Sequence, residues 1–219
     1  MIEYLVPLIL VGLALLFQAL DIIGAVCATL FAYIILIRHN IFWLYIIFGF
    51  FLIGFLATVF KRSYKNKYSI HKTRTVGNVI ANGILAVLMA LIGNFYAFIG
   101  AVAAACGDTL SSEIGMLSKE KPVMINTFKK EKPGVNGAVS WLGTLMSIVG
   151  GAFIGLLAWP IFPYPKIILI GAVCGFLGSL FDSYIGATLE NSGYLDNFGV
   201  NLITTVFGAL IGIIFFVWF

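Results

Sequence analysis

The sequence predicts an all-α protein, a polytopic bundle of about eight transmembrane helices that forms a single integral-membrane domain over residues 1–219. Apolar residues make up 61% of the chain and charged residues only 10%, and the mean hydropathy is +1.07. A soluble domain of this length could not hide so much apolar surface. The 24 glycines are typical of membrane helices that pack closely through small residues.

Eight apolar runs are the expected membrane spans, because a spanning helix needs about 20 apolar residues. They cover residues 4–20, 22–37, 41–60, 76–92, 95–115, 137–159, 167–190 and 199–219. The first two runs are short, so these helices are either tilted or partly re-entrant.

The distribution of basic residues predicts the orientation of the bundle. Segment 61–75 contains six Lys or Arg residues and segment 116–133 contains five, which together are eleven of the thirteen in the chain. The positive-inside rule places both segments in the cytoplasm and, with eight spans, both termini outside. The basic residues lie between apolar spans rather than on one folded face, so the charge does not indicate a nucleic-acid partner.

Two carboxylates fall inside expected spans, each on a stripe of small residues. In the fifth span the stripe is Gly100, Ala104, Asp108, Ser111 and Gly115, and in the seventh it is Gly171, Gly175, Gly178, Asp182 and Gly186. Steps of three and four residues keep each stripe on one helix face. Close helix packing alone would explain the stripes, but a charge within a bilayer costs about 3 kcal/mol on insertion scales and indicates a functional site.

The two carboxylates predict a magnesium site at the cytoplasmic face. Mg²⁺ is bound by one or two carboxylates together with phosphate oxygens, so Asp108 and Asp182 are the expected metal ligands. Glu113 lies about 140° around the helix from Asp108 and needs a different neighbour or acts at the helix end. The chain has no G-x-x-x-x-G-K-[ST] loop, which excludes a P-loop enzyme.

The candidate phosphate contacts are polar or glycine residues near the cytoplasmic ends of the spans. They are Arg74, Asn78, Asn82, Ser111, Ser112, Lys132, Gly134, Asn136, Asn197 and Asn201. The segment from Lys132 to Asn136 enters the sixth span, where a helix N-terminus would favour an anion, although a simple turn before a helix explains it equally well. Helix capping and ligand contact are both compatible with the asparagines.

Four blocks of this sequence resemble the signatures of a known integral-membrane family, the one that contains the plant phytyl-phosphate kinase. The blocks are GDTLSSEIG (107–115), KPGVNGAVSWLGT (132–144), GFLGSLFDSYIGATLE (175–190) and DNFGVNLIT (196–204). The family is more distantly similar to dolichol kinases and phosphatidate cytidylyltransferases. Val123 departs from its pattern, which has an arginine after Pro122.

The resemblance implies a CTP-dependent kinase that converts a prenyl monophosphate, phytyl- or geranylgeranyl-like, to the diphosphate at the cytoplasmic face of the cell membrane. CTP or another nucleoside triphosphate would be the phosphoryl donor and Mg²⁺ the cofactor. Asp108, Glu113, Asp182 and Lys132 are the expected catalytic residues. An ion-coupled transporter and a lipid-phosphate cytidylyltransferase are the alternatives; the acids lie toward one face rather than at the midplane, which disfavours transport.

Overall fold

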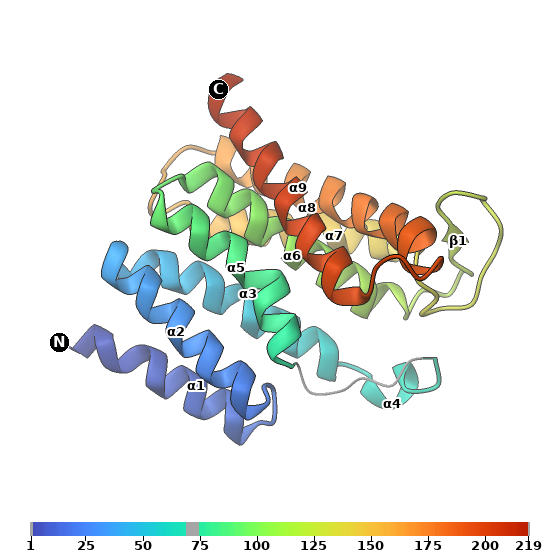
Figure 1. Ribbon diagram of the computed structural model, residues 1–219. Helices are drawn as coiled ribbons and strands as arrows, with labels where there is room; N and C mark the ends of the chain where they lie inside the picture. Colours follow the sequence, from blue (N-terminus) through green and yellow to red (C-terminus); the bar gives the residue numbers. More distant parts are fainter. Residues whose placement is uncertain (1, 69–74, 219) are drawn as a thin grey trace.

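A computed structural model describes residues 2–68 and 75–218 and is helical almost throughout (Figure 1). The elements in chain order are η1 (Ile2–Leu5), α1 (Val6–Leu16), α2 (Ile22–Arg38), α3 (Ile41–Val59), α4 (Arg62–Lys65), α5 (Val76–Leu91), α6 (Phe95–Gly115), β1 (Val123–Met124), β2 (Ala138–Val139), α7 (Trp141–Ala158), α8 (Lys166–Ile185), η2 (Gly186–Glu190) and α9 (Asn197–Trp218). The all-α prediction is confirmed.

Five helices of the described chain are long and apolar enough to cross a membrane: α3, α6, α7, α8 with η2, and α9. The other apolar helices, α1, α2 and α5, are shorter, with 11, 17 and 16 residues. The structure therefore supports a multi-pass membrane protein. The count of eight crossings and the external termini remain predictions.

Two expected boundaries are wrong by four residues: helix α1 ends at Leu16 rather than at residue 20, and the sixth span does not begin at residue 137. Ala138–Val139 instead forms β2 and pairs antiparallel with β1, with Val123 opposite Val139. Helix α7 begins only at Trp141, where the Ser140 hydroxyl accepts a hydrogen bond from the Gly143 amide at 3.1 Å. A strand pairing and a serine N-cap thus delay the helix by four residues.

The connections divide between the two ends of the bundle (Figure 1). At one end, the Arg38 and His39 side chains form hydrogen bonds with the last carbonyl groups of α5. The turn that connects α5 to α6 lies at the same end. At the other end, the Asn126 side chain donates to the Ala187 carbonyl, and the Asn191 side chain donates to the Asn136 carbonyl. The second end, which we call the polar end, gathers residues 16–22, 59–68, 113–140 and 186–198.

Helix α6 is the central helix, and its residues 97–107 are all buried. It packs against α7, α8 and α9 through backbone contacts that only small residues allow. A Cβ at Gly100 would lie 2.2 Å from the Gly208 carbonyl oxygen, and a Cβ at Gly107 would lie 2.5 Å from that of Gly175. Helices α1 and α2 lie beyond this core, with α2 against α5 and α1 against α2 (Figure 1).

The contact between α7 and α8 depends on glycine at position 151. A Cβ there would lie 2.1 Å from the Gly171 carbonyl oxygen, which is backbone and cannot move aside. We expect Gly151→Ala to lower the free energy of unfolding by about 1–3 kcal/mol, the usual cost of overpacking, as measured by thermal unfolding in detergent.

Gly12→Ala is the matched control, because a Cβ at Gly12 in α1 would meet nothing within 4 Å. Alanine is a better helix former than glycine, so this variant should be neutral or slightly stabilising. Equal melting temperatures for the two variants would contradict the packing argument.

Candidate functional site

A cavity of about 540 Å³ opens among α1, α2, α3, α5, α6 and α9. Polar side chains line it where these helices reach the polar end of the bundle. They are Thr58, Thr75, Asn78, Asn82, Asp108, Thr109, Ser112, Glu113, Asn197 and Asn201. Seven of the predicted site residues therefore line one cavity: Asp108 and six residues that are not predicted metal ligands. They come from three helices that are distant in sequence.

The remainder of the cavity wall is apolar and comes mainly from α1, α2 and α3. These residues are Pro7, Leu10, Val11, Ala14, Leu20, Ala28, Phe31, Ala32, Leu44, Ile47, Phe48, Phe50, Phe51, Val79, Gly83 and Val102. The cavity thus joins a polar end to a long apolar interior. Its shape and chemistry suit an amphiphile whose charged group lies at the polar end.

The structure brings the carboxyl groups of Asp108 and Asp182 within hydrogen-bonding reach of each other. Asp108 lines the cavity, whereas Asp182 lies behind it on α8. The Thr204 hydroxyl, buried on α9, donates to Asp182 Oδ2 at 2.9 Å and fixes that carboxylate. The helices place the pair by close contact, since a Cβ at Gly178 would lie 2.6 Å from the Ala104 Cβ.

This donor set fits Mg²⁺ only in part. Two carboxylates meet, but within residues 2–68 and 75–218 no three His, Cys, Asp or Glu side chains are grouped so that they could hold a metal. Mg²⁺ commonly takes one or two carboxylates and completes its octahedron with water and substrate phosphates. Asp108 and Asp182 therefore fit a metal that arrives with a phosphate ligand.

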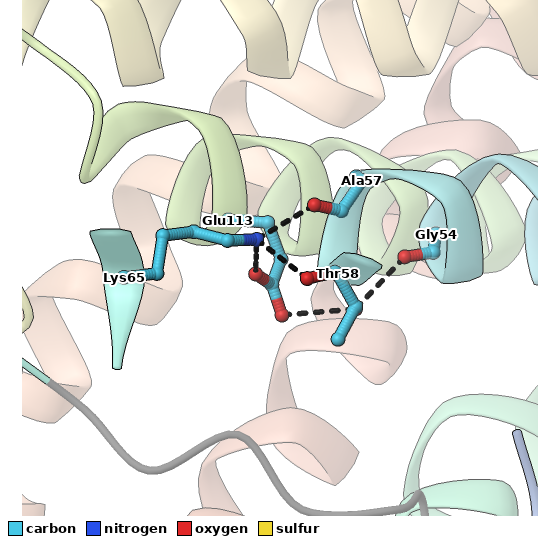
Figure 2. Close-up of polar contacts among 5 residues, drawn as sticks. All are labelled: Gly54, Ala57, Thr58, Lys65 and Glu113. Atoms are coloured by element: carbon cyan, nitrogen blue, oxygen red, sulfur yellow. Dashed lines mark hydrogen bonds and ion pairs between the residues drawn. The ribbon is translucent and has the colours of Figure 1, made fainter. Parts of the chain in front are cut away.

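Glu113 lines the cavity beside Asp108 but has its own partners (Figure 2). Its Oε2 accepts from Lys65 Nζ at 2.5 Å, and its Oε1 lies 2.9 Å from the Thr58 hydroxyl. That hydroxyl is also 2.9 Å from the Gly54 carbonyl oxygen, so its single hydrogen serves one acceptor or the other. Both Glu113 oxygens thus lie within hydrogen-bonding distance of protein groups, and Oε2 is held by the buried ammonium group.

Lys65 is fully buried, which the sequence did not suggest, because it belongs to a cationic segment without any acid. Its ammonium group donates to the Ala57 and Thr58 carbonyls at 2.7 and 2.8 Å, as well as to Glu113 (Figure 2). These carbonyls belong to the last turn of α3, where a cation is favoured by the helix dipole. Lys65 therefore ties the end of α3 to α6.

The asparagines that line the cavity also form hydrogen bonds within their own helices. Asn78 Oδ1 accepts from the Thr75 amide at 3.1 Å in a capping box, and Asn82 donates to the Asn78 carbonyl. Asn201 donates to the Asn197 carbonyl and side-chain oxygens at 2.9 and 3.0 Å. Capping and ligand contact are both possible for the same side chains, because each amide has further donors or acceptors.

Several predicted phosphate contacts lie outside the cavity. The Ser111 oxygens lie 3.0 Å from where a Gly143 Cβ would be, so this serine packs against α7. Gly134 lies near Tyr68 and Met116, and Asn136 lies against the end of α8 near Gly186. Because α7 begins only at Trp141, this segment does not enter a helix N-terminus, which corrects that part of the prediction.

Lys132 is exposed in the same polar-end loop. Arg74 lies outside the described residues.

Sequence reasoning missed five polar residues that shape the site: Thr58, Lys65, Thr75, Thr109 and Thr204. Thr204 had a usable signal, since Asn197, Asn201 and Thr204 follow one another at steps of four and three and so share a helix face. Thr58 and Thr109 belong to no such pattern: their sequence neighbours are apolar residues or residues already assigned to the site. Nothing local marks Lys65, because its burial depends on a partner 48 residues away.

The fold and the cavity define the class: a multi-helix integral membrane protein whose polar site opens at one end of the bundle and continues into an apolar interior. Residues 5–209 match the family model described as integral membrane protein DUF92, and the chain belongs to this family. The family resemblance of the signature blocks is thereby confirmed.

Relatives of the chain occur in archaea and plants. An uncharacterised membrane protein of Methanocaldococcus jannaschii is 36% identical over 206 residues, which are 91% of this chain and 87% of the relative. Protein PGR of Arabidopsis thaliana is 38% identical over 120 residues, 49% of this chain and 41% of that protein.

The chloroplastic Protein VTE6 of the same plant is 27% identical over 188 residues, 76% of this chain and 56% of that protein. The match thus covers less than two thirds of either plant protein. No solved structure matches the chain.

Proposed function

We propose that this protein is a membrane kinase that converts a prenyl monophosphate to the diphosphate with CTP as phosphoryl donor. The observation that carries the proposal is the cavity, which joins Asp108 and a set of amides and hydroxyls to a long apolar wall. A prenyl phosphate has the same two parts. The family membership supports the proposal, because the resemblance implies a lipid-phosphate kinase.

The proposed reaction is a transfer of the γ-phosphoryl group. An oxygen of the prenyl phosphate attacks the γ-phosphorus of CTP, the bond from that phosphorus to the β-phosphate bridging oxygen breaks, and CDP leaves. The nucleophile is already anionic, so no general base is required. The protein must therefore align two anions and stabilise their charge, which is most of what phosphoryl transfer asks of an enzyme.

The residues divide this task between them. Asp108 and Asp182 would hold Mg²⁺, which supplies neutralisation of the phosphate charge when it is bound. Asn78, Asn82, Asn197 and Asn201 would orient phosphate oxygens through their amide groups, and the Ser112 hydroxyl would add a donor. Lys132 would contact the nucleotide phosphates at the polar end, and Arg74 is proposed as a further phosphate contact. These roles are proposals for each residue.

The test is turnover by the purified full chain in detergent with radiolabelled CTP and short prenyl monophosphates. We expect a diphosphate lipid and CDP in equal amounts. Release of pyrophosphate with a CDP-linked lipid would instead indicate a cytidylyltransferase. No consumption of any nucleoside triphosphate would reject an enzyme of either kind and favour a transporter.

Removal of the divalent cation should abolish this turnover, because two carboxylates at the site would otherwise repel the substrate phosphates. We expect EDTA to stop CDP release and added Mg²⁺ to restore it. Since no third protein ligand joins the pair in the described chain, metal binding should also be much tighter with nucleotide than without it, as isothermal titration would show. Full activity in EDTA would contradict the proposed role.

We further propose that the polar end faces the cytoplasm, where CTP is available. The positive-inside rule supports this orientation, since nine of the eleven Lys and Arg residues that the structure describes belong to that end. Ser118→Cys in the loop after α6, labelled with a membrane-impermeant maleimide, tests it. Labelling is expected in inverted vesicles and not in intact cells, and the reverse pattern would overturn the orientation.

A further inference from the structure

The apolar part of the cavity is long. Its wall on α3 runs from Thr58 to Leu44, and its wall on α1 runs from Ala14 to Pro7. At 1.5 Å per residue the α3 wall extends about 20 Å along its helix and the α1 wall about 10 Å. The hydrocarbon core of a bilayer is about 30 Å thick, so the cavity reaches through most of the apolar layer.

The cavity is elongated. A volume of about 540 Å³ along a length of about 20 Å leaves room for an extended hydrocarbon chain. One wall is closed by aromatic packing, because the Phe31 ring lies 3.1 Å from where a Gly83 Cβ would be and so fills the contact between α2 and α5.

Two alanines of α2 border this slot. Ala28 and Ala32 are one turn apart, lie on the same helix face and both line the cavity. Measured from the Asp21 cap at the polar end, they lie about 10 and 16 Å deep along the helix. Their methyl side chains leave the slot open at two depths where a larger side chain would block it.

We propose that the cavity binds the apolar part of a phosphate-bearing lipid, and that Ala28 and Ala32 determine how long a chain it accepts. The proposal rests on the proposed function for the identity of the head group. It adds the residues that act as determinants of chain-length specificity.

The test measures binding without nucleotide, so that it does not depend on catalysis. Prenyl monophosphates of one to four isoprene units displace a fluorescent alkyl phosphate from the purified full chain in one fixed detergent. For the unmodified protein, affinity should rise with each added unit until the chain fills the slot.

Blocking variants should shorten the accepted chain according to their depth. Ala28→Phe should weaken binding of the longest phosphate at least tenfold and leave the shortest within twofold. Ala32→Phe, which lies deeper, should weaken only the longest. Val26→Phe is the matched control, since Val26 is 57% exposed on α2 and does not line the cavity; it should keep the unmodified length dependence.

An unchanged length dependence in both cavity variants would overturn the proposal. If Ala28→Phe does not fold, Ala28→Leu is measured in the same way. The kinase proposal can fail separately: a depth-dependent length preference without phosphoryl transfer would reject the kinase and keep the slot. Transfer with a length preference that Ala28→Phe does not alter would reject the slot and keep the kinase.

Discussion

Asp108→Asn should lower the turnover number by roughly 10²–10³-fold or more, because it removes one of two carboxylates that meet at the polar end of the cavity. The loss of a single preorganised electrostatic group at a reacting centre commonly costs this much. Asparagine has nearly the same shape, so helix α6 should pack as before. CDP release under saturating CTP and prenyl phosphate measures the effect, and thermal unfolding confirms that the variant is folded.

Asp182→Asn should have an effect of similar size by the same reasoning, although its carboxylate lies behind Asp108. Its Oδ2 accepts a hydrogen bond from the Thr204 hydroxyl. The side-chain oxygen of asparagine can accept the same bond, so the fold should survive. Asp196→Asn is the matched control at the same end. Its Oδ1 caps the start of α9 through the Gly199 amide at 2.9 Å, and asparagine caps equally well.

Normal turnover in Asp108→Asn or Asp182→Asn would remove that residue from the metal site. A loss of turnover in Asp196→Asn as large as in the other two would show that any acid at the polar end is needed, and would leave the specific pairing without support. The expected pattern is therefore two inactive variants and one active one, with all three unfolding at similar temperatures.

Helical periodicity is the reason that the carboxylate pair could be predicted. Asp108 and Asp182 each follow small residues at steps of three and four, and small residues mark the faces along which membrane helices approach. The structure shows this contact directly, with Gly178 against Ala104. Local spacing therefore carried information on two residues that are 74 positions apart.

The apolar walls of the cavity could not be predicted in this way. Ala28, Phe31 and Ala32 line the cavity, whereas their neighbours Val26 and Leu30 are exposed on the same helix. In a membrane helix both faces are apolar, because lipid and protein interior have similar polarity. Composition does not separate a cavity wall from a lipid-facing surface, and only the packing of α1, α2 and α3 does so.

The start of α7 and the burial of Lys65 could not be predicted from the sequence for a related reason. From the sequence alone, residues 138 and 139 look like the beginning of an apolar helix. Their pairing with Val123 and Met124 shows that they form a strand instead. Lys65 reads as a solvated loop residue until Glu113 is known to meet it. Both depend on contacts between distant segments, which spacing along the chain does not encode.

Lys65→Met should reduce the free energy of unfolding by about 3–5 kcal/mol, the usual cost of removing one partner of a buried ion pair. The variant leaves the Glu113 carboxylate without its ammonium partner and the Ala57 and Thr58 carbonyls without their donor. Thermal unfolding in detergent measures this loss. Lys67→Met is the control, because Lys67 is exposed two residues away and its removal should change stability by less than about 0.5 kcal/mol.

The double variant Lys65→Met with Glu113→Met separates the two possible roles of this acid. Replacing both partners by apolar side chains of similar volume removes the unpaired charge, so most of the lost stability should return. Both Glu113 oxygens already contact protein groups, and we therefore expect the folded double variant to keep turnover within about tenfold of the unmodified protein. Turnover as low as that of Asp108→Asn, in a double variant with restored stability, would show instead that the Glu113 carboxylate takes part in the reaction itself.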